Sequence, residues 1–197
     1  MMNYLELLKN RSSCRKYTNE PVSCEDLEKI IMAANAAPIG SSRTEDIHLT
    51  VVEDRAVLDK MAEAMERRRE DKAAMANITE KIKDDNAKLK AKFDPFYGAP
   101  AVIFISHRKQ DIQPGIEYCN VTTVALAMHL AATEMGLGSV FMWGSLEAMR
   151  MYPEYDNTAV LELPEGFEPL LGVAVGHRAA EPKDKELTAD KLTVNYF

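Results

Sequence analysis

The spacing of apolar positions along the chain predicts several amphipathic helices. Asn3 and Glu6 form a capping-box pattern at the start of a short helix. Ser23 is the expected N-cap of a second helix, and a third is expected after Asp54. The longest helix is expected from Pro114 to Met135 and is apolar nearly all round, as is typical of a helix buried in a core or in a subunit interface.

Four short apolar segments have the length and composition of β-strands: residues 47–52, 101–105, 139–143 and 170–175. The second is a continuous apolar run between Pro100 and the polar Ser106, which indicates an internal strand buried on both faces. A short helix is expected to begin at Ser145. Helices and strands interleave without an internal repeat, so residues 1–197 are expected to form a single α+β domain.

Two segments depart from this pattern. Residues 66–92 are crowded with charges of both signs, which predicts a solvated helical excursion rather than a binding surface. Residues 181–197 are a mostly polar C-terminal extension with a few apolar anchors.

Composition narrows the classes of function. The chain has 197 residues, 46% of them hydrophobic and 28% charged, as expected of one soluble globular domain. A formal net charge of -7 disfavours nucleic acid or an anionic membrane as partner. No signal peptide or membrane-spanning run of ~20 apolar residues is evident, so a cytoplasmic location is expected. Neither the three cysteines nor the four histidines have metal-ligand spacing, and no metal site is expected.

The segment Arg11-Ser12-Ser13-Cys14-Arg15 concentrates phosphate-binding groups. Arginine offers a planar fork that matches phosphate oxygens, and hydroxyl and backbone N–H groups can satisfy the remaining acceptors. The segment by itself is more typical of a polar surface loop.

Three further segments carry candidate chemistry. Residues 36–43 combine small residues, a proline and a glycine, so backbone there can approach a flat ligand. The run from Gly136 to Gly144 is a tight turn followed by a short strand that ends at Trp143. Lys183 and Lys185 follow Gly176-His177-Arg178 and could close on a phosphate together.

Together, the order and spacing of these four segments resemble the nitroreductase-like flavoprotein family from about Asn3 to Leu187. The resemblance implies a mixed, mostly antiparallel sheet flanked by helices, and a homodimer with the long helix at the interface and two sites for flavin mononucleotide (FMN). It implies an oxidoreductase in which NADH or NADPH and an electron acceptor react in turn by a ping-pong cycle. It implies no catalytic side chain, because the flavin carries the chemistry.

The resemblance also assigns roles to residues. The FMN phosphate, ribityl chain and pyrimidine edge would be held by Arg11, Ser12, Ser13, Arg15, Lys183 and Lys185. The partner subunit would contribute Pro38, Ile39, Ser41 and Ser42. The isoalloxazine would lie along Phe141, Met142, Trp143 and Gly144, with a backbone N–H near its N5.

The turn after the second helix departs from the family pattern, since Ile39, Ser42 and Thr44 replace a serine, an asparagine and a glutamine. This departure keeps a second hypothesis open, a flavin-binding protein that stores or senses FMN without efficient turnover. A third is an interaction protein that uses the charged segment 66–92. The sequence does not choose between NADH and NADPH, or between nitroaromatic, quinone and similar acceptors.

Overall fold

A computed structural model describes residues 3–75, 94–144, 146, 152–182 and 185–196, with side chains described for all of these except residues 69–75. The helices are α1 (Tyr4–Asn10), α2 (Cys24–Asn35), α3 (Arg55–Met75) and α5 (Ile116–Glu134). The strands are β1 (Ile47–Val52), β2 (Ala101–Arg108), β3 (Gly138–Phe141) and β4 (Phe167–Gly176). Short 3-10 turns lie at Gly40–Ser42, Thr44–Asp46, Pro153–Tyr155 and Thr158–Leu161.

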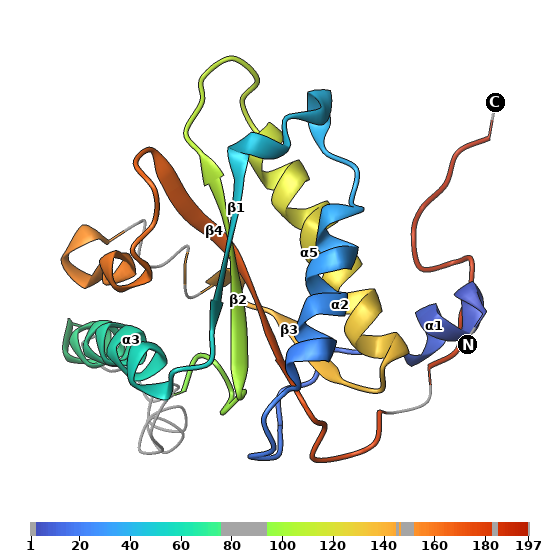
Figure 1. Ribbon diagram of the computed structural model, residues 1–197, viewed down its shortest axis with the longest axis horizontal. Coiled ribbons are helices and arrows are strands. Elements are labelled where there is room, and N and C mark those ends of the chain that lie inside the picture. The colour runs from blue at the N-terminus through green and yellow to red at the C-terminus, as the bar shows by residue number, and fades with distance from the viewer. Residues whose placement is uncertain (1–2, 76–93, 145, 147–151, 183–184, 197) are drawn as a thin grey trace.

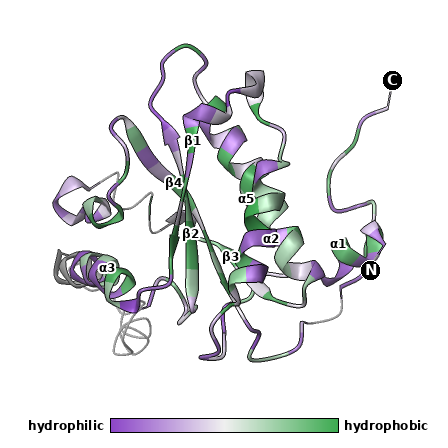
Figure 2. Ribbon diagram, viewed as in Figure 1, coloured by the Kyte–Doolittle hydropathy of each residue, from purple (hydrophilic) through white to green (hydrophobic). Residues whose placement is uncertain are grey.

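The four strands form one sheet in the order β1-β2-β4-β3, and each neighbouring pair is antiparallel. Helices α2 and α5 cover one face, while α3 and the turns near residues 153–161 cover the other (Figure 1). The expected α+β fold with a mostly antiparallel sheet is therefore confirmed. Each face buries its own apolar cluster, and β2 and β4 contribute to both. Such central strands must be apolar on both sides, and Figure 2 shows hydrophobic residues along them.

Three of the predicted helix starts are confirmed. Asn3 caps α1 in a full capping box with Glu6, and the Ser23 side chain accepts a hydrogen bond from the Asp26 N–H at the start of α2. The Asp54 side chain accepts from the Ala56 N–H at 2.8 Å, at the start of α3. These side chains satisfy backbone donors that have no partner within the helix.

Several predicted boundaries were wrong. Strand β2 continues to Arg108, because the polar Ser106 and His107 are buried within the sheet rather than exposed beyond it. Strand β4 begins at Phe167 instead of 170, and β3 ends at Phe141 instead of 143. Helix α5 begins at Ile116, because Gly115 before it has a φ of 92°.

The charged segment 66–92 is helical as far as Met75, where α3 ends. Its residues 76–92 lie outside the described part of the chain, as does Ser145, the expected start of a short helix. Among the described helices, none combines the length and the hydropathy needed to cross a bilayer.

Candidate functional site

The loop after α1 is fixed on one side by strand β3. Ser13 forms a parallel bridge with Ser139, and the Cys14 N–H donates to the Ser139 carbonyl at 2.9 Å. Gly138 makes this approach possible: a Cβ atom there would lie 2.6 Å from Cys14 Sγ. The contact holds the serines of residues 11–15 at the edge strand of the sheet.

The segment after β4 fixes the other side of this loop. Tyr17 forms an antiparallel bridge with Arg178, and the Ala179 N–H donates to the Lys16 carbonyl at 3.1 Å. The Tyr17 hydroxyl donates to the Cys14 carbonyl at 2.8 Å, and burial raises the pKa of Tyr17. These bonds hold the loop after α1 against the segment that follows β4.

The structure brings three of the predicted phosphate ligands, Arg11, Ser12 and Lys185, together with Arg178. Lys185 Nζ donates to the Arg11 carbonyl at 3.2 Å, and Arg178 Nη1 donates to Ser12 Oγ at 3.1 Å. Arg178 was not among the predicted ligands. Lys183, which was predicted, lies outside the described residues.

A pocket of about 440 Å³ opens where these segments meet. Its lining includes Ser12, Ser13, Arg15 and Arg178, together with the carboxylate of Glu181. This volume lies within the range of ~300–1,000 Å³ that is usual for small-molecule sites. The pocket therefore brings hydroxyl and guanidinium groups together at a site large enough for a phosphorylated ligand.

Arg11, Arg178 and Lys185 form a cation cluster around His129. His129 itself is only 2% exposed. Its Nε2 lies 3.0 Å from Arg11 Nη1, and its Nδ1 is hydrogen-bonded to Ser139 Oγ. Burial, followed by the charges of Arg11, Arg178 and Lys185, lowers the pKa of His129 to about 4. The three cations are thus close enough to act on one ring.

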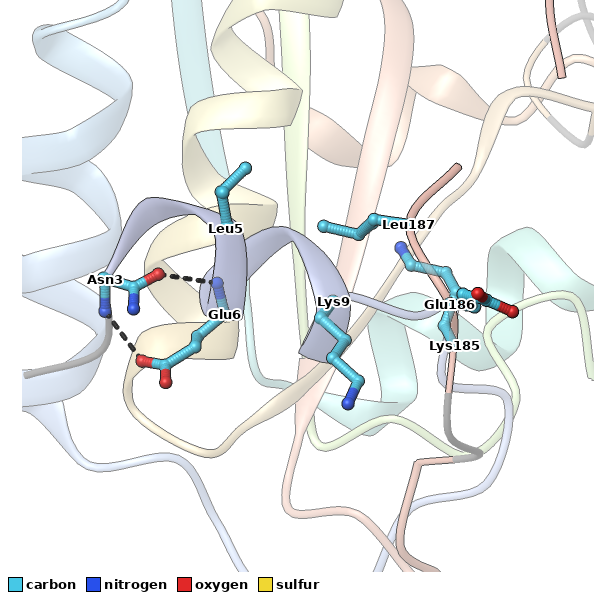
Figure 3. A pocket seen from close by; sticks show the side chains of 7 residues that line it. All are labelled: Asn3, Leu5, Glu6, Lys9, Lys185, Glu186 and Leu187. Atoms are coloured by element: carbon cyan, nitrogen blue, oxygen red, sulfur yellow. Dashed lines mark hydrogen bonds between the residues drawn. The ribbon is translucent and has the colours of Figure 1, made fainter. Parts of the chain in front are cut away.

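The C-terminal tail also passes alongside α1 (Figure 3). Between them lies a pocket of about 620 Å³ whose lining includes Leu5, Lys9, Lys185 and Leu187. Burial and the neighbouring Arg11 guanidinium lower the pKa of Lys185. The tail therefore places Lys185 beside Arg11 in the loop after α1.

The predicted partner-facing residues Pro38, Ile39, Ser41 and Ser42 lie near the opposite end of α5. The Gly40 N–H donates to Asn120 Oδ1 at 2.9 Å, whereas the cation cluster surrounds His129. Nine residues of α-helix separate these positions by ~13 Å along the axis. Ser41 and Ser42 have φ values of 57° and 53°, so the backbone of this turn is in the left-handed region. Within one chain the two predicted sets do not meet.

The predicted isoalloxazine-facing segment divides by burial. Trp143 is 52% exposed, and Phe141 and Gly144 are also exposed. Met142 is buried, and its N–H donates to the Gly172 carbonyl at 2.7 Å. The side chain of Met142 is therefore a core residue, and the N–H groups left for a ligand are those of Trp143 and Gly144.

Sequence reasoning missed the roles of Arg178 and His129 at this site. A signal for Arg178 was present in the sequence, because it is a basic residue directly after Gly176-His177, in the segment that leads to the predicted lysines. His129 was not among the predicted site residues, and its ring is hydrogen-bonded to Arg11 and to Ser139. Within the described parts of the chain, no three His, Cys, Asp or Glu side chains gather as metal ligands would.

Comparison with known proteins gives a consistent result. The sequence pattern of the nitroreductase family matches residues 8–177. An FMN reductase (NAD(P)H) of Bacillus subtilis is 28% identical over 186 residues, which cover 91% of this chain and 67% of that protein. A nitroreductase with bound FMN from Desulfitobacterium hafniense is 26% identical with a TM-score of 0.76, covering 100% of both chains. A second, from Bacteroides fragilis, is 27% identical with a TM-score of 0.73, covering 99% of this chain and 100% of that one.

Proposed function

Because this chain belongs to the nitroreductase family, we propose that it is an FMN-dependent oxidoreductase that takes reducing equivalents from NADH or NADPH and passes them to a small organic acceptor. Relatives that were crystallised with FMN or are named as an FMN reductase support the cofactor and the nicotinamide. The observation that carries the proposal is the cluster of cations around the loop after α1.

The residues of this cluster suit the phosphate of FMN. A phosphate monoester carries about two negative charges at neutral pH, and Arg11, Arg15, Arg178 and Lys185 offer four positive charges. Among the described residues, none of the four is ion-paired with a carboxylate. In a protein of net charge -7, such a group of cations is typical of a bound anion, because, in the part of the chain that the structure describes, Glu181 is the one acidic residue that lines the pocket and offsets only part of their mutual repulsion.

The residues at the C-terminal end of β3 can contact the isoalloxazine ring of FMN. FMN, when bound, supplies hydride and electron transfer through its isoalloxazine ring. The exposed Phe141 and Trp143 can pack along such a ring, and the N–H groups of Trp143 and Gly144 can donate to its edge. The chain has only to orient these groups and leave one face open, so we assign no catalytic acid or base.

We also propose a homodimer with FMN between the subunits. Large apolar side chains are exposed along α1, α5 and the tail: Tyr4, Leu5, Leu126, Leu187, Leu192, Val194 and Tyr196. Surface of this kind is costly in water and typical of an interface. The distance between the 38–42 turn and the cation cluster in one chain supports a partner that brings the two together. Analytical ultracentrifugation tests the dimer, and a monomer that retains FMN would contradict this arrangement.

An absorbance spectrum of the natively purified protein, followed by anaerobic titration with each nicotinamide, tests the function. We expect a yellow protein whose flavin absorbance is lost on addition of NADH or NADPH and returns with a quinone or nitroaromatic. Yellow protein that responds to neither nicotinamide would favour the storage or sensing function, which the altered residues Ile39, Ser42 and Thr44 keep open. Colourless protein that takes up no added FMN would contradict both.

A further inference from the structure

The ring of His129 has a defined hydrogen-bond direction. Nε2 lies 3.0 Å from Arg11 Nη1, and a guanidinium can only donate. Nε2 is therefore the acceptor, and the proton of the neutral ring lies on Nδ1, where it is donated to Ser139 Oγ. This chain of bonds runs from the loop after α1, through α5, to strand β3.

The surroundings of His129 keep its ring neutral. Arg11 approaches from the end of α1, Arg178 from the segment after β4 and Lys185 from the tail, and all three lower its pKa. The Phe141 ring on β3 lies 5.2 Å from the imidazole, centroid to centroid. Among the described residues, no carboxylate is paired with His129 that could compensate a positive charge on it.

Arg11 has limited support from other side chains. Among the described residues, His129 is the side chain that hydrogen-bonds its guanidinium, whereas the hydrogen bond from Lys185 goes to its carbonyl oxygen. A long, flexible guanidinium loses rotamer entropy when it is held in place to bind an anion. An acceptor that fixes one of its N–H groups in advance reduces that loss on binding.

We propose that neutral His129 is a positioning residue of the phosphate site, which holds the Arg11 guanidinium through Nε2 and couples it to β3 through Ser139. This inference rests on the proposed FMN site and adds to it a residue that sets the preference for a phosphorylated flavin. Since Arg11 would contact the phosphate, loss of His129 should weaken the binding of FMN. The binding of riboflavin, which has no phosphate, should be unaffected.

Two substitutions separate positioning from packing. His129→Leu fills similar volume but offers no acceptor to Arg11. His129→Gln places an amide oxygen near the position of Nε2 and can still accept that hydrogen bond. Apoprotein of each variant is titrated with FMN and with riboflavin, and binding is followed by quenching of flavin fluorescence.

We expect His129→Leu to weaken FMN roughly tenfold with little change for riboflavin, and His129→Gln to restore most of the FMN affinity. An unchanged ratio of FMN to riboflavin affinity in His129→Leu would overturn the inference and leave the proposed function intact. Wild-type protein that binds neither flavin would instead remove the proposed function and this inference with it.

A measurement on wild-type apoprotein keeps the inference testable if His129→Leu does not fold. Histidine-ring ¹⁵N NMR distinguishes the two neutral tautomers. We expect the Nδ1–H form for His129 between pH 6 and pH 8, with the Nδ1–H resonance shifted in Ser139→Ala. A ring protonated on Nε2, or on both nitrogens at pH 7, would contradict the proposal, because Arg11 would then have no acceptor.

Discussion

Lys185 donates from Nζ to the backbone carbonyl of Arg11 at 3.2 Å, although 174 positions separate the two residues. The contact joins the C-terminal tail to the loop after α1. It places two cations side by side. Burial and the charge of Arg11 both lower the pKa of Lys185, and the repulsion between the two cations costs free energy unless an anion compensates it. If the proposed phosphate site binds an anion, this contact would couple the order of the tail to its occupation.

Replacement of this lysine tests that coupling. We expect Lys185→Ala to weaken FMN binding roughly ten- to hundredfold, because a charge-assisted hydrogen bond contributes about 1.5–3 kcal/mol. Lys29→Ala is a matched control, since Lys29 is an exposed cation on α2 that pairs with Glu25 at 2.8 Å, and it should bind FMN normally. Equal FMN affinity in the two variants, measured by fluorescence titration, would show that Lys185 does not reach the phosphate.

Removal of two loop arginines should be more severe. Arg11→Ala combined with Arg15→Ala is expected to leave the purified protein without bound FMN while its circular dichroism stays native. A small loss of stability is expected as well, because His129 Nε2 loses its partner at 3.0 Å and a buried unpaired polar group is destabilising. The double control Lys29→Ala with Lys109→Ala removes two exposed, ion-paired cations and should keep its flavin. Full FMN occupancy in the arginine variant would locate the phosphate elsewhere.

Local patterns were sufficient to predict much of the fold. Strand β1 has the predicted bounds Ile47–Val52, and the caps at Asn3 and Ser23 are as expected, because these features depend on neighbouring residues. The end of β2 was missed for a tertiary reason. His107 is buried because its Nδ1 meets the Arg108 carbonyl at 2.7 Å and its Nε2 meets Asn120 at 3.1 Å, and Asn120 lies on a different element.

The same distinction applies to the site. The family resemblance predicted the Arg11-to-Arg15 loop and Lys185 as phosphate ligands, and the structure brings Lys185 to the Arg11 carbonyl. The role of Arg178 depends on its contact with Ser12, which is 166 positions away in the chain. His129 is a polar residue in an apolar helix, and only the packing of α5 against α1 and β3 shows what its ring bonds to. A single sequence can therefore suggest the class of ligand, but it does not show which distant residues contact one another at the site.

The buried His129 predicts how stability depends on pH. Its pKa is lowered from about 6.5 to about 4 in the folded chain, so the unfolded chain binds more protons between these values. Its contribution is complete above pH 6.5 and is lost as the pH falls toward 4, which amounts to about 2 kcal/mol between pH 8 and pH 5. Urea unfolding of the apoprotein at both pH values measures this loss, and carboxylates contribute a background. In His129→Gln the loss should be smaller by about 2 kcal/mol, and parallel profiles for the two proteins would contradict the assignment.

Two glycines near the site should separate folding from ligand binding. A Cβ at Gly138 would lie 2.6 Å from Cys14 Sγ and 2.9 Å from Arg178 Cγ, so Gly138→Ala forces the loop and the segment after β4 away from β3. We expect it to cost about 1–3 kcal/mol of stability and to weaken FMN binding as well.

At Gly144 a Cβ would meet no atom of the described residues within 4 Å, so Gly144→Ala should keep the melting temperature of the apoprotein. If flavin passes close to this backbone, the added methyl group will still weaken FMN, and riboflavin to the same extent, because the obstacle is to the ring and not to the phosphate. Thermal melts and flavin titrations of both variants decide the matter: unchanged flavin affinity in Gly144→Ala would move the isoalloxazine away from the end of β3.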